Sequence, residues 1–120
     1  MQKRILFISR HSPYGSSIAR EALDAVLASA AYDQQISLLF MDDGVFQLLP
    51  QQDPSSIGQK SFAAMLSVLP LYDVNTIFVH QQSLQSRGIE PGDIILEDAQ
   101  IIDSCGVNQL LTQQDQLLSF

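Results

Sequence analysis

The side chains best suited to nucleophilic or acid–base chemistry are one cysteine, Cys105, and two histidines, His11 and His80. A reactive thiol needs a basic neighbour, yet the charged residue closest to Cys105 in the sequence is Asp103. We therefore interpret Cys105 as a small, partly buried side chain, and a thiol enzyme that acts through Cys105 stays open as an alternative. A single cysteine forms no internal disulfide, and one cysteine with two histidines falls short of a structural zinc cluster. We expect no metal and no cofactor.

His80 follows the apolar run 75–80, NTIFVH, which predicts a strand. In parallel sheets, ligands and chemistry gather at the carboxyl ends of the strands, so this position is a candidate site. A hydrolase would need Ser83 or Ser12 as nucleophile, and neither lies on a recognisable elbow motif. The simplest prediction is a structural histidine that bonds a local backbone carbonyl, with a role in catalysis left open.

Asp42 and Asp43 follow the second predicted strand and have the chemistry to bind Mg²⁺. Such a site needs a further carboxylate at a neighbouring strand end, but the first strand ends in Arg10 and the third in His80. We predict instead that Asp43 caps a short helix that begins at Gly44.

The loop 9–17 combines hydroxyl groups, a glycine and the start of a helix, which together resemble an anion cradle. Pro13 removes one of its N–H donors, and a capped helix needs the same residues. A flavodoxin-like domain that binds a phosphate or cofactor through Ser12–Ser17 stays open as the alternative function.

Hydrophobic periodicity predicts alternating strands and helices over one domain, residues 1–120. We expect strands at 4–9, 35–41, 75–80, 93–96 and 116–120, and helices at 18–31, 45–49, 57–69, 83–87 and 104–111. Gly88 should end the helix 83–87 in the left-handed conformation. Alternation of this kind predicts a three-layer α/β sandwich with a mostly parallel central sheet.

The charge balance limits the partners of this domain. Six Lys and Arg residues against thirteen Asp and Glu give a net charge of −7, and the basic residues are scattered. Nucleic acids and anionic membranes are bound through clustered basic residues, so we expect neither as a direct partner. No run of residues is long and apolar enough to span a membrane or to act as a signal peptide, so we expect a cytoplasmic protein.

Several segments together resemble the TusC/DsrF branch of the DsrE/F/H family. They are SPYG, EALDAVLASA, MDDGVFQLLP, LPLYDV, VHQQSLQSRGI and QLLSF, and they extend over essentially the whole chain. The combination of DGVFQLLP with LYD and SLxxRG is fairly specific. The resemblance implies a DsrE/F/H-like fold and a place in a sulfur relay, in which persulfide sulfur passes between proteins toward the 2-thio group of the tRNA wobble uridine.

The resemblance also implies the partners and the position of the reactive thiol. Family members of this kind form hetero-oligomers, expected to be heterohexamers, with TusB-like and TusD-like subunits. The sulfur-carrying subunits hold a cysteine just after the third strand, at or beside the position of His80 here. Imidazole cannot carry sulfane sulfur, so the resemblance implies a non-catalytic subunit of a sulfurtransferase complex, not an enzyme by itself.

Apolar residues beyond the needs of one core are candidates for the subunit interface. They lie on the short helix, at the end of the following helix and at the carboxyl terminus: Val45, Phe46, Leu48, Leu49, Leu69, Leu71, Tyr72, Leu117, Leu118 and Phe120.

Overall fold

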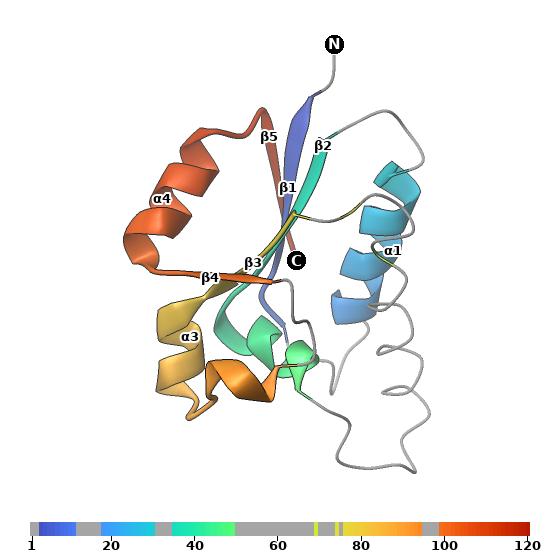
Figure 1. Ribbon diagram of the computed structural model, residues 1–120. Coiled ribbons are helices and arrows are strands. Elements are labelled where there is room, and N and C mark those ends of the chain that lie inside the picture. The colour runs from blue at the N-terminus through green and yellow to red at the C-terminus, as the bar shows by residue number, and fades with distance from the viewer. Residues whose placement is uncertain are drawn as a thin grey trace.

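The computed structural model describes residues 3–11, 18–30, 35–49, 69, 74, 76–94 and 99–120. Its centre is a five-stranded sheet with the order β4-β3-β2-β1-β5, in which every pairing is parallel (Figure 1). The strands are β1 (Arg4–Ser9), β2 (Gln35–Phe40), β3 (Thr76–His80), β4 (Gln100–Ile102) and β5 (Gln116–Ser119). The helices are α1 (Ile18–Ala30), α3 (Gln81–Ser86) and α4 (Ser104–Thr112), with 3₁₀ helices η1 (Asp42–Leu48) and η3 (Pro91–Asp93).

Both faces of the sheet are covered, which explains why β1 is apolar at successive positions. Ile5 and Phe7 belong to one core cluster, which also contains Leu23 and Val26 of α1. The alternate residues Leu6 and Ile8 belong to a second cluster, with Val107 and Leu110 of α4. Figure 1 shows α1 and α4 on opposite sides of the sheet. The α/β sandwich expected from the alternating pattern is therefore confirmed.

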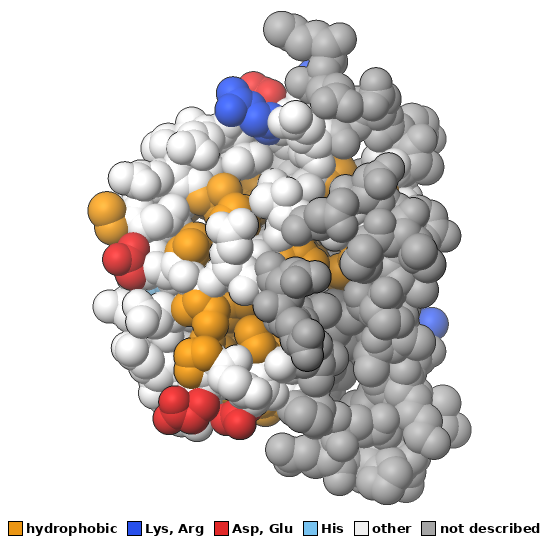
Figure 2. All heavy atoms as spheres, viewed as in Figure 1, with side chains coloured by type: hydrophobic (Ala, Val, Ile, Leu, Met, Phe, Trp, Pro, Cys, Tyr) orange, Lys and Arg blue, Asp and Glu red, His pale blue; other side chains and the backbone are white. Residues whose placement is uncertain are grey.

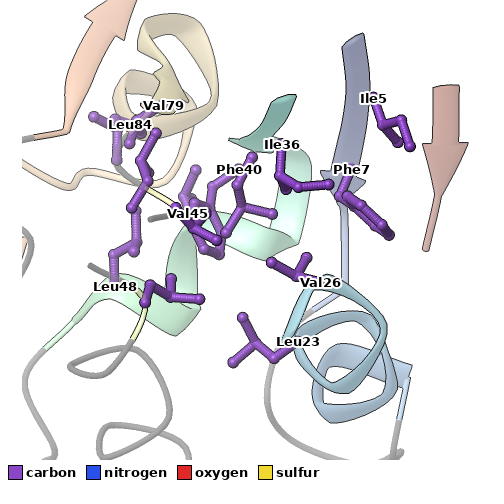
Figure 3. Packing of buried hydrophobic residues seen from close by; sticks show 14 of the residues in the cluster. Ile5, Phe7, Leu23, Val26, Ile36, Phe40, Val45, Leu48, Val79 and Leu84 are labelled. Carbon is purple, nitrogen blue, oxygen red and sulfur yellow. The ribbon is translucent and has the colours of Figure 1, made fainter. Parts of the chain in front are cut away.

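The 3₁₀ helix η1 packs its apolar side chains inward at one end of the sheet. Val45 and Leu48 are fully buried, and Figure 3 shows both among the core side chains, with Val45 next to Phe40. Gly44 brings η1 against the end of β1, because a Cβ atom there would lie 2.0 Å from the carbonyl oxygen of Ser9. Only glycine fits this contact, which explains the DDG sequence after the second strand.

The strands predicted at 4–9, 35–41, 75–80 and 116–120 are confirmed within one residue at either end. The strand predicted at 93–96 is wrong at residue 93, because Glu90 and Asp93 form a capping box around the 3₁₀ helix η3. Residues 95 and 96 of this predicted strand lie outside the described residues. The fourth strand is instead Gln100–Ile102, which pairs with β3. Gly88 has a φ of 67° and ends α3 as predicted.

The predicted helix 57–69 lies outside the described residues except for Leu69, which is buried. Among the described residues, no helix has the length and hydrophobicity needed to cross a membrane.

Candidate functional site

Parallel pairing brings the carboxyl ends of β1, β2, β3 and β4 to one edge of the sheet. This edge carries Ser9 at the end of β1 with Arg10 after it, Asp42 after β2, His80 at the end of β3 and Ser104 just after β4. The residues that the sequence analysis singled out near strands β1, β2 and β3 therefore share one edge of the sheet. Ser104, 24 positions from His80, was not singled out.

Both ring nitrogens of His80 contact serine hydroxyl groups. Nδ1 lies 2.7 Å from Oγ of Ser83, and Nε2 lies 2.9 Å from Oγ of Ser104. The Ser104 hydroxyl is also 2.7 Å from Oε1 of Gln82, and the Ser83 hydroxyl accepts the backbone N–H of Asp42 at 2.9 Å. The expected bond from His80 to a backbone carbonyl is thus replaced by two side-chain bonds, although the structural interpretation of the residue still fits.

The contacts of the two serines determine where the imidazole hydrogen sits. The amide oxygen of Gln82 can only accept, so the Ser104 hydroxyl donates its single hydrogen to it. His80 must then donate from Nε2 to Ser104, which leaves Nδ1 of the neutral ring as the acceptor for Ser83. The hydrogens on the His80 ring nitrogen and on the two serine hydroxyls each have an acceptor within the chain. We call Gln82, Ser104, His80, Ser83 and the N–H of Asp42 the His80 network.

This arrangement does not support a hydrolase. Ser83 is close enough to His80 for activation, but it is buried, with 3% of its surface exposed, and its oxygen already accepts the Asp42 N–H. The far nitrogen of His80 faces the hydroxyl of Ser104 and not the carboxylate that orients the base of a catalytic triad. Ser12, the other candidate nucleophile, lies outside the described residues.

The two aspartates after β2 each bind an arginine. Asp42 contacts Nε of Arg10 at 2.8 Å, and Asp43 contacts both Nε and Nη2 of Arg87 at 3.0 Å. Asp42 adopts a left-handed backbone with φ of 52°. The prediction that Asp43 caps the short helix was wrong, because η1 has Met41 at its N-cap and no side-chain capping bond. Within the described residues no three His, Cys, Asp or Glu side chains converge on a possible metal site.

Gln47 is a buried polar residue that the sequence analysis did not single out. Its Nε2 donates to Oγ of Ser9 and to the carbonyl of His11, both at 2.7 Å, and so ties η1 to the end of β1. Its only sequence signal is a glutamine in the apolar run VFQLL. The proposed phosphate loop Ser12–Ser17, which continues from this point, lies outside the described residues.

Cys105 is exposed at the second position of α4, in contrast to the partly buried side chain expected from the sequence. Asp103 caps this helix by accepting the N–H of Gly106 at 2.8 Å. The thiol therefore lies on the element after β4 and not at the end of β3.

The candidate interface residues fall into separate groups. Val45, Leu48 and Leu69 are fully buried and belong to the core. The candidates that remain for an interface here are the half-buried Phe46 on η1 and Leu49 directly after it. Phe120 is also half-buried, and its ring stacks on Phe7 with a centroid distance of 6.2 Å. Leu117 on the edge strand β5 is 46% exposed. Leu71 and Tyr72 lie outside the described residues.

Comparison with known proteins identifies the family. The model of the DsrE/DsrF-like family matches residues 3–120. This chain belongs to the DsrE/DsrF-like family. It is 41% identical to the Protein TusC homolog of Vibrio parahaemolyticus over 98% of both chains. It is also 37% identical to the intracellular sulfur oxidation protein DsrF of Allochromatium vinosum, over 98% of this chain and 96% of that protein.

Solved structures agree with this family fold. The ychN protein from E. coli superposes with a TM-score of 0.81 at 24% identity, with complete coverage of both chains. The protein MTH1491 from Methanobacterium thermoautotrophicum gives a TM-score of 0.74 at 18% identity, over 99% of this chain and 100% of that one. These likenesses establish the architecture of this DsrE/DsrF-like chain, while its function depends on the sequence relatives and on the site.

Proposed function

We propose that this chain is a non-catalytic subunit of a cytoplasmic sulfur-relay complex. In this proposal it assembles with TusB-like and TusD-like subunits into a hetero-oligomer that passes persulfide sulfur toward 2-thiolation of the tRNA wobble uridine. The observation that carries the proposal is the end-to-end similarity to proteins named TusC homolog, at 41% and 39% identity. The similarity to DsrF supports sulfur transfer as the shared theme.

The side chains at the carboxyl edge of the sheet support the proposal that a partner subunit, and not this chain, carries the sulfur. Sulfane sulfur is carried on a thiolate, and the end of β3 presents the imidazole of His80 with both nitrogens bonded to serines. The single thiol, Cys105, is on α4 and has the capping carboxylate of Asp103 two residues before it. These features favour a subunit that supports the relay while a partner carries the sulfur.

Co-expression with the TusB-like and TusD-like proteins of the same organism tests the proposal. We expect one stable complex that contains all three chains, measured by native mass spectrometry. Deletion of the gene for this chain should lower the 2-thiouridine content of tRNA, measured by nucleoside mass spectrometry. Absence of a complex would contradict the assembly, and an unchanged 2-thiouridine content would contradict the role in tRNA thiolation.

A further inference from the structure

A groove separates the outer side of η1 from the turn that follows α3. It has a volume of about 550 Å³ and is lined by Phe46, Leu49, Arg87, Gly88, Ile89, Gly92 and Asp93. A second hollow of about 290 Å³ shares Gly88 and Ile89 with it and extends along α3 to Glu90. We call the first of these the η1–α3 groove.

We infer that the η1–α3 groove binds a partner-subunit segment that carries an apolar side chain next to a lysine or arginine. This inference rests on the proposed function, because it takes the occupant to be one of the partner subunits in the complex. It states where on this chain the partner subunit binds and which kinds of side chain the partner provides.

The apolar part of the groove packs directly on the main hydrophobic core. Phe46 and Leu49 are half-buried side chains that pack on the main core, and Ile89 is 8% exposed. The fully buried neighbours Val45 and Leu48 hold η1 in place from the inside. A preformed apolar surface of this kind suits a buried side chain from a partner, because little conformational entropy is lost when it binds.

Arg87 is the only basic residue that lines the groove in the described part of the chain, and its charge is already paired. Its Nε and Nη2 atoms both contact Asp43, and Nη1 donates to the carbonyl of Ser83 at 3.2 Å. Its guanidinium carbon lies 6.0 Å from the ring centroid of Phe46. The side chain is 24% exposed and is held from three directions, so it forms part of the wall.

Among the described residues, the other charged side chains at the groove and the adjoining hollow are carboxylates. Asp93 lines it, Glu90 lines the adjoining hollow, and Asp43 is 60% exposed although it pairs with Arg87. Figure 2 shows apolar side chains gathered next to acidic ones at the lower end of the drawn face, over α3 and η3. In the part of the chain that the structure describes, one paired arginine against three carboxylates leaves an acidic rim, which attracts a basic group at the edge of a contact.

The same charge argues against a second copy of this chain as the occupant. The chain has a net charge of −7, so two copies repel each other, and its six basic residues are scattered along the sequence. A different subunit that offers an apolar residue beside a lysine or arginine fits both parts of the groove.

The test uses the assembled complex with the TusB-like and TusD-like subunits and measures its dissociation over a dilution series by native mass spectrometry. Leu49→Ser removes apolar contact, and we expect about tenfold weaker association, as for a moderate interface anchor. The double variant Asp43→Asn with Asp93→Asn keeps the side-chain shapes and should weaken association about fivefold at low salt. That loss should shrink in about 0.5 M salt, where screening shortens the range of these charges to a few ångströms.

The matched control is Asp24→Asn with Asp115→Asn, which makes the same change in net charge on α1 and just before β5, at residues that do not line the groove. The amide that replaces the Asp115 carboxylate keeps an oxygen that can accept the backbone N–H of Arg4. We expect it to assemble like the unmodified chain, and thermal unfolding should show that all variants are folded. Equal losses in the control and groove variants would overturn the inference, because net charge alone would then explain them. Unchanged assembly of the groove variants would also overturn it while leaving the proposed function intact. If the unmodified chain forms no complex, the proposed function fails and the groove inference fails with it.

Discussion

The His80 network and the η1–α3 groove both use residues of η1, α3 and their flanks, and the network adds Ser104 of α4. Their polar groups are satisfied in different ways. In the network, each hydrogen on His80, Ser83 and Ser104 has an acceptor within the chain. In the groove, Arg87 is paired but Asp93 and Glu90 are exposed beside an apolar floor. Ser83 joins the two regions, since its hydroxyl belongs to the network and its carbonyl accepts from Arg87.

Because of this difference, we expect the His80 network to contribute to stability and the η1–α3 groove to contribute to recognition of a partner. A satisfied polar network gains little from a new ligand, because a ligand must replace bonds that already exist. An apolar hollow with charged edges gains from a partner, because water leaves the apolar surface and the charges find counterparts. We therefore expect the end of β3, where parallel sheets usually place chemistry, to be the more structural of the two regions in this chain.

The largest expected effect comes from Gly44→Ala, which disturbs both regions together. The added Cβ would lie 2.0 Å from the carbonyl oxygen of Ser9, so η1 must move away from β1. We expect a loss of about 3 kcal/mol or more in the free energy of unfolding, the upper range for overpacking a tight contact. Urea denaturation followed by circular dichroism measures it. A variant as stable as the original chain would show that η1 can shift freely.

A second comparison divides η1 into its inner and outer sides. Leu48→Ala removes a fully buried side chain and should cost about 3 kcal/mol of stability. Phe46→Ser with Leu49→Ser should instead keep a folded chain and weaken association with the partner subunits more than tenfold, as for two interface anchors. Thermal unfolding and native mass spectrometry measure the two effects. If the outer double variant simply unfolds, that side is core as well and the interface hypothesis fails.

Mutations in the His80 network should lower the free energy of unfolding but leave the rate of sulfur transfer unchanged. His80→Ala removes the partner of both serines and should cost about 2 kcal/mol, near the sum of two typical net hydrogen bonds. Ser104→Ala is the milder comparison, because it leaves the pair of His80 and Ser83 intact and should cost about 1 kcal/mol. Single-turnover persulfide transfer through the assembled complex tests the prediction that the transfer rate is unchanged. A slowing of tenfold or more by His80→Ala, with normal assembly, would mean that this edge takes part in the relay.

Cys105→Ser is expected to have the smallest effect. The thiol is exposed on α4, and its replacement by a hydroxyl of similar size should change stability by less than about 0.5 kcal/mol. Persulfide transfer through the complex should continue at the original rate, measured with the same single-turnover assay. Loss of transfer with an intact complex would identify this chain as a sulfur carrier and would contradict the non-catalytic assignment.

The local pattern of the sequence was sufficient to predict most of the sheet. Apolar runs such as 4–9 are typical of strands that are buried on both faces, and the strands at 35–40, 76–80 and 116–119 follow the same logic. The fourth strand was misplaced because residues 100–102 are too few to show a period, and because Pro91 and Gly92 begin a 3₁₀ helix. A strand of three residues is stabilised by its pairing with β3, which no local pattern records.

The sequence by itself determined the parallel α/β architecture, the acidic surface and the presence of a single thiol, because composition and hydrophobic period express these directly. Only the tertiary structure decided which polar groups meet. It brought Ser104 to His80 across 24 positions, Arg87 to Asp43 across 44, and Gly44 against the carbonyl of Ser9. It also divided η1 into buried and accessible sides. These outcomes depend on how strand ends converge at one edge of a sheet, and such convergence is a property of long-range packing.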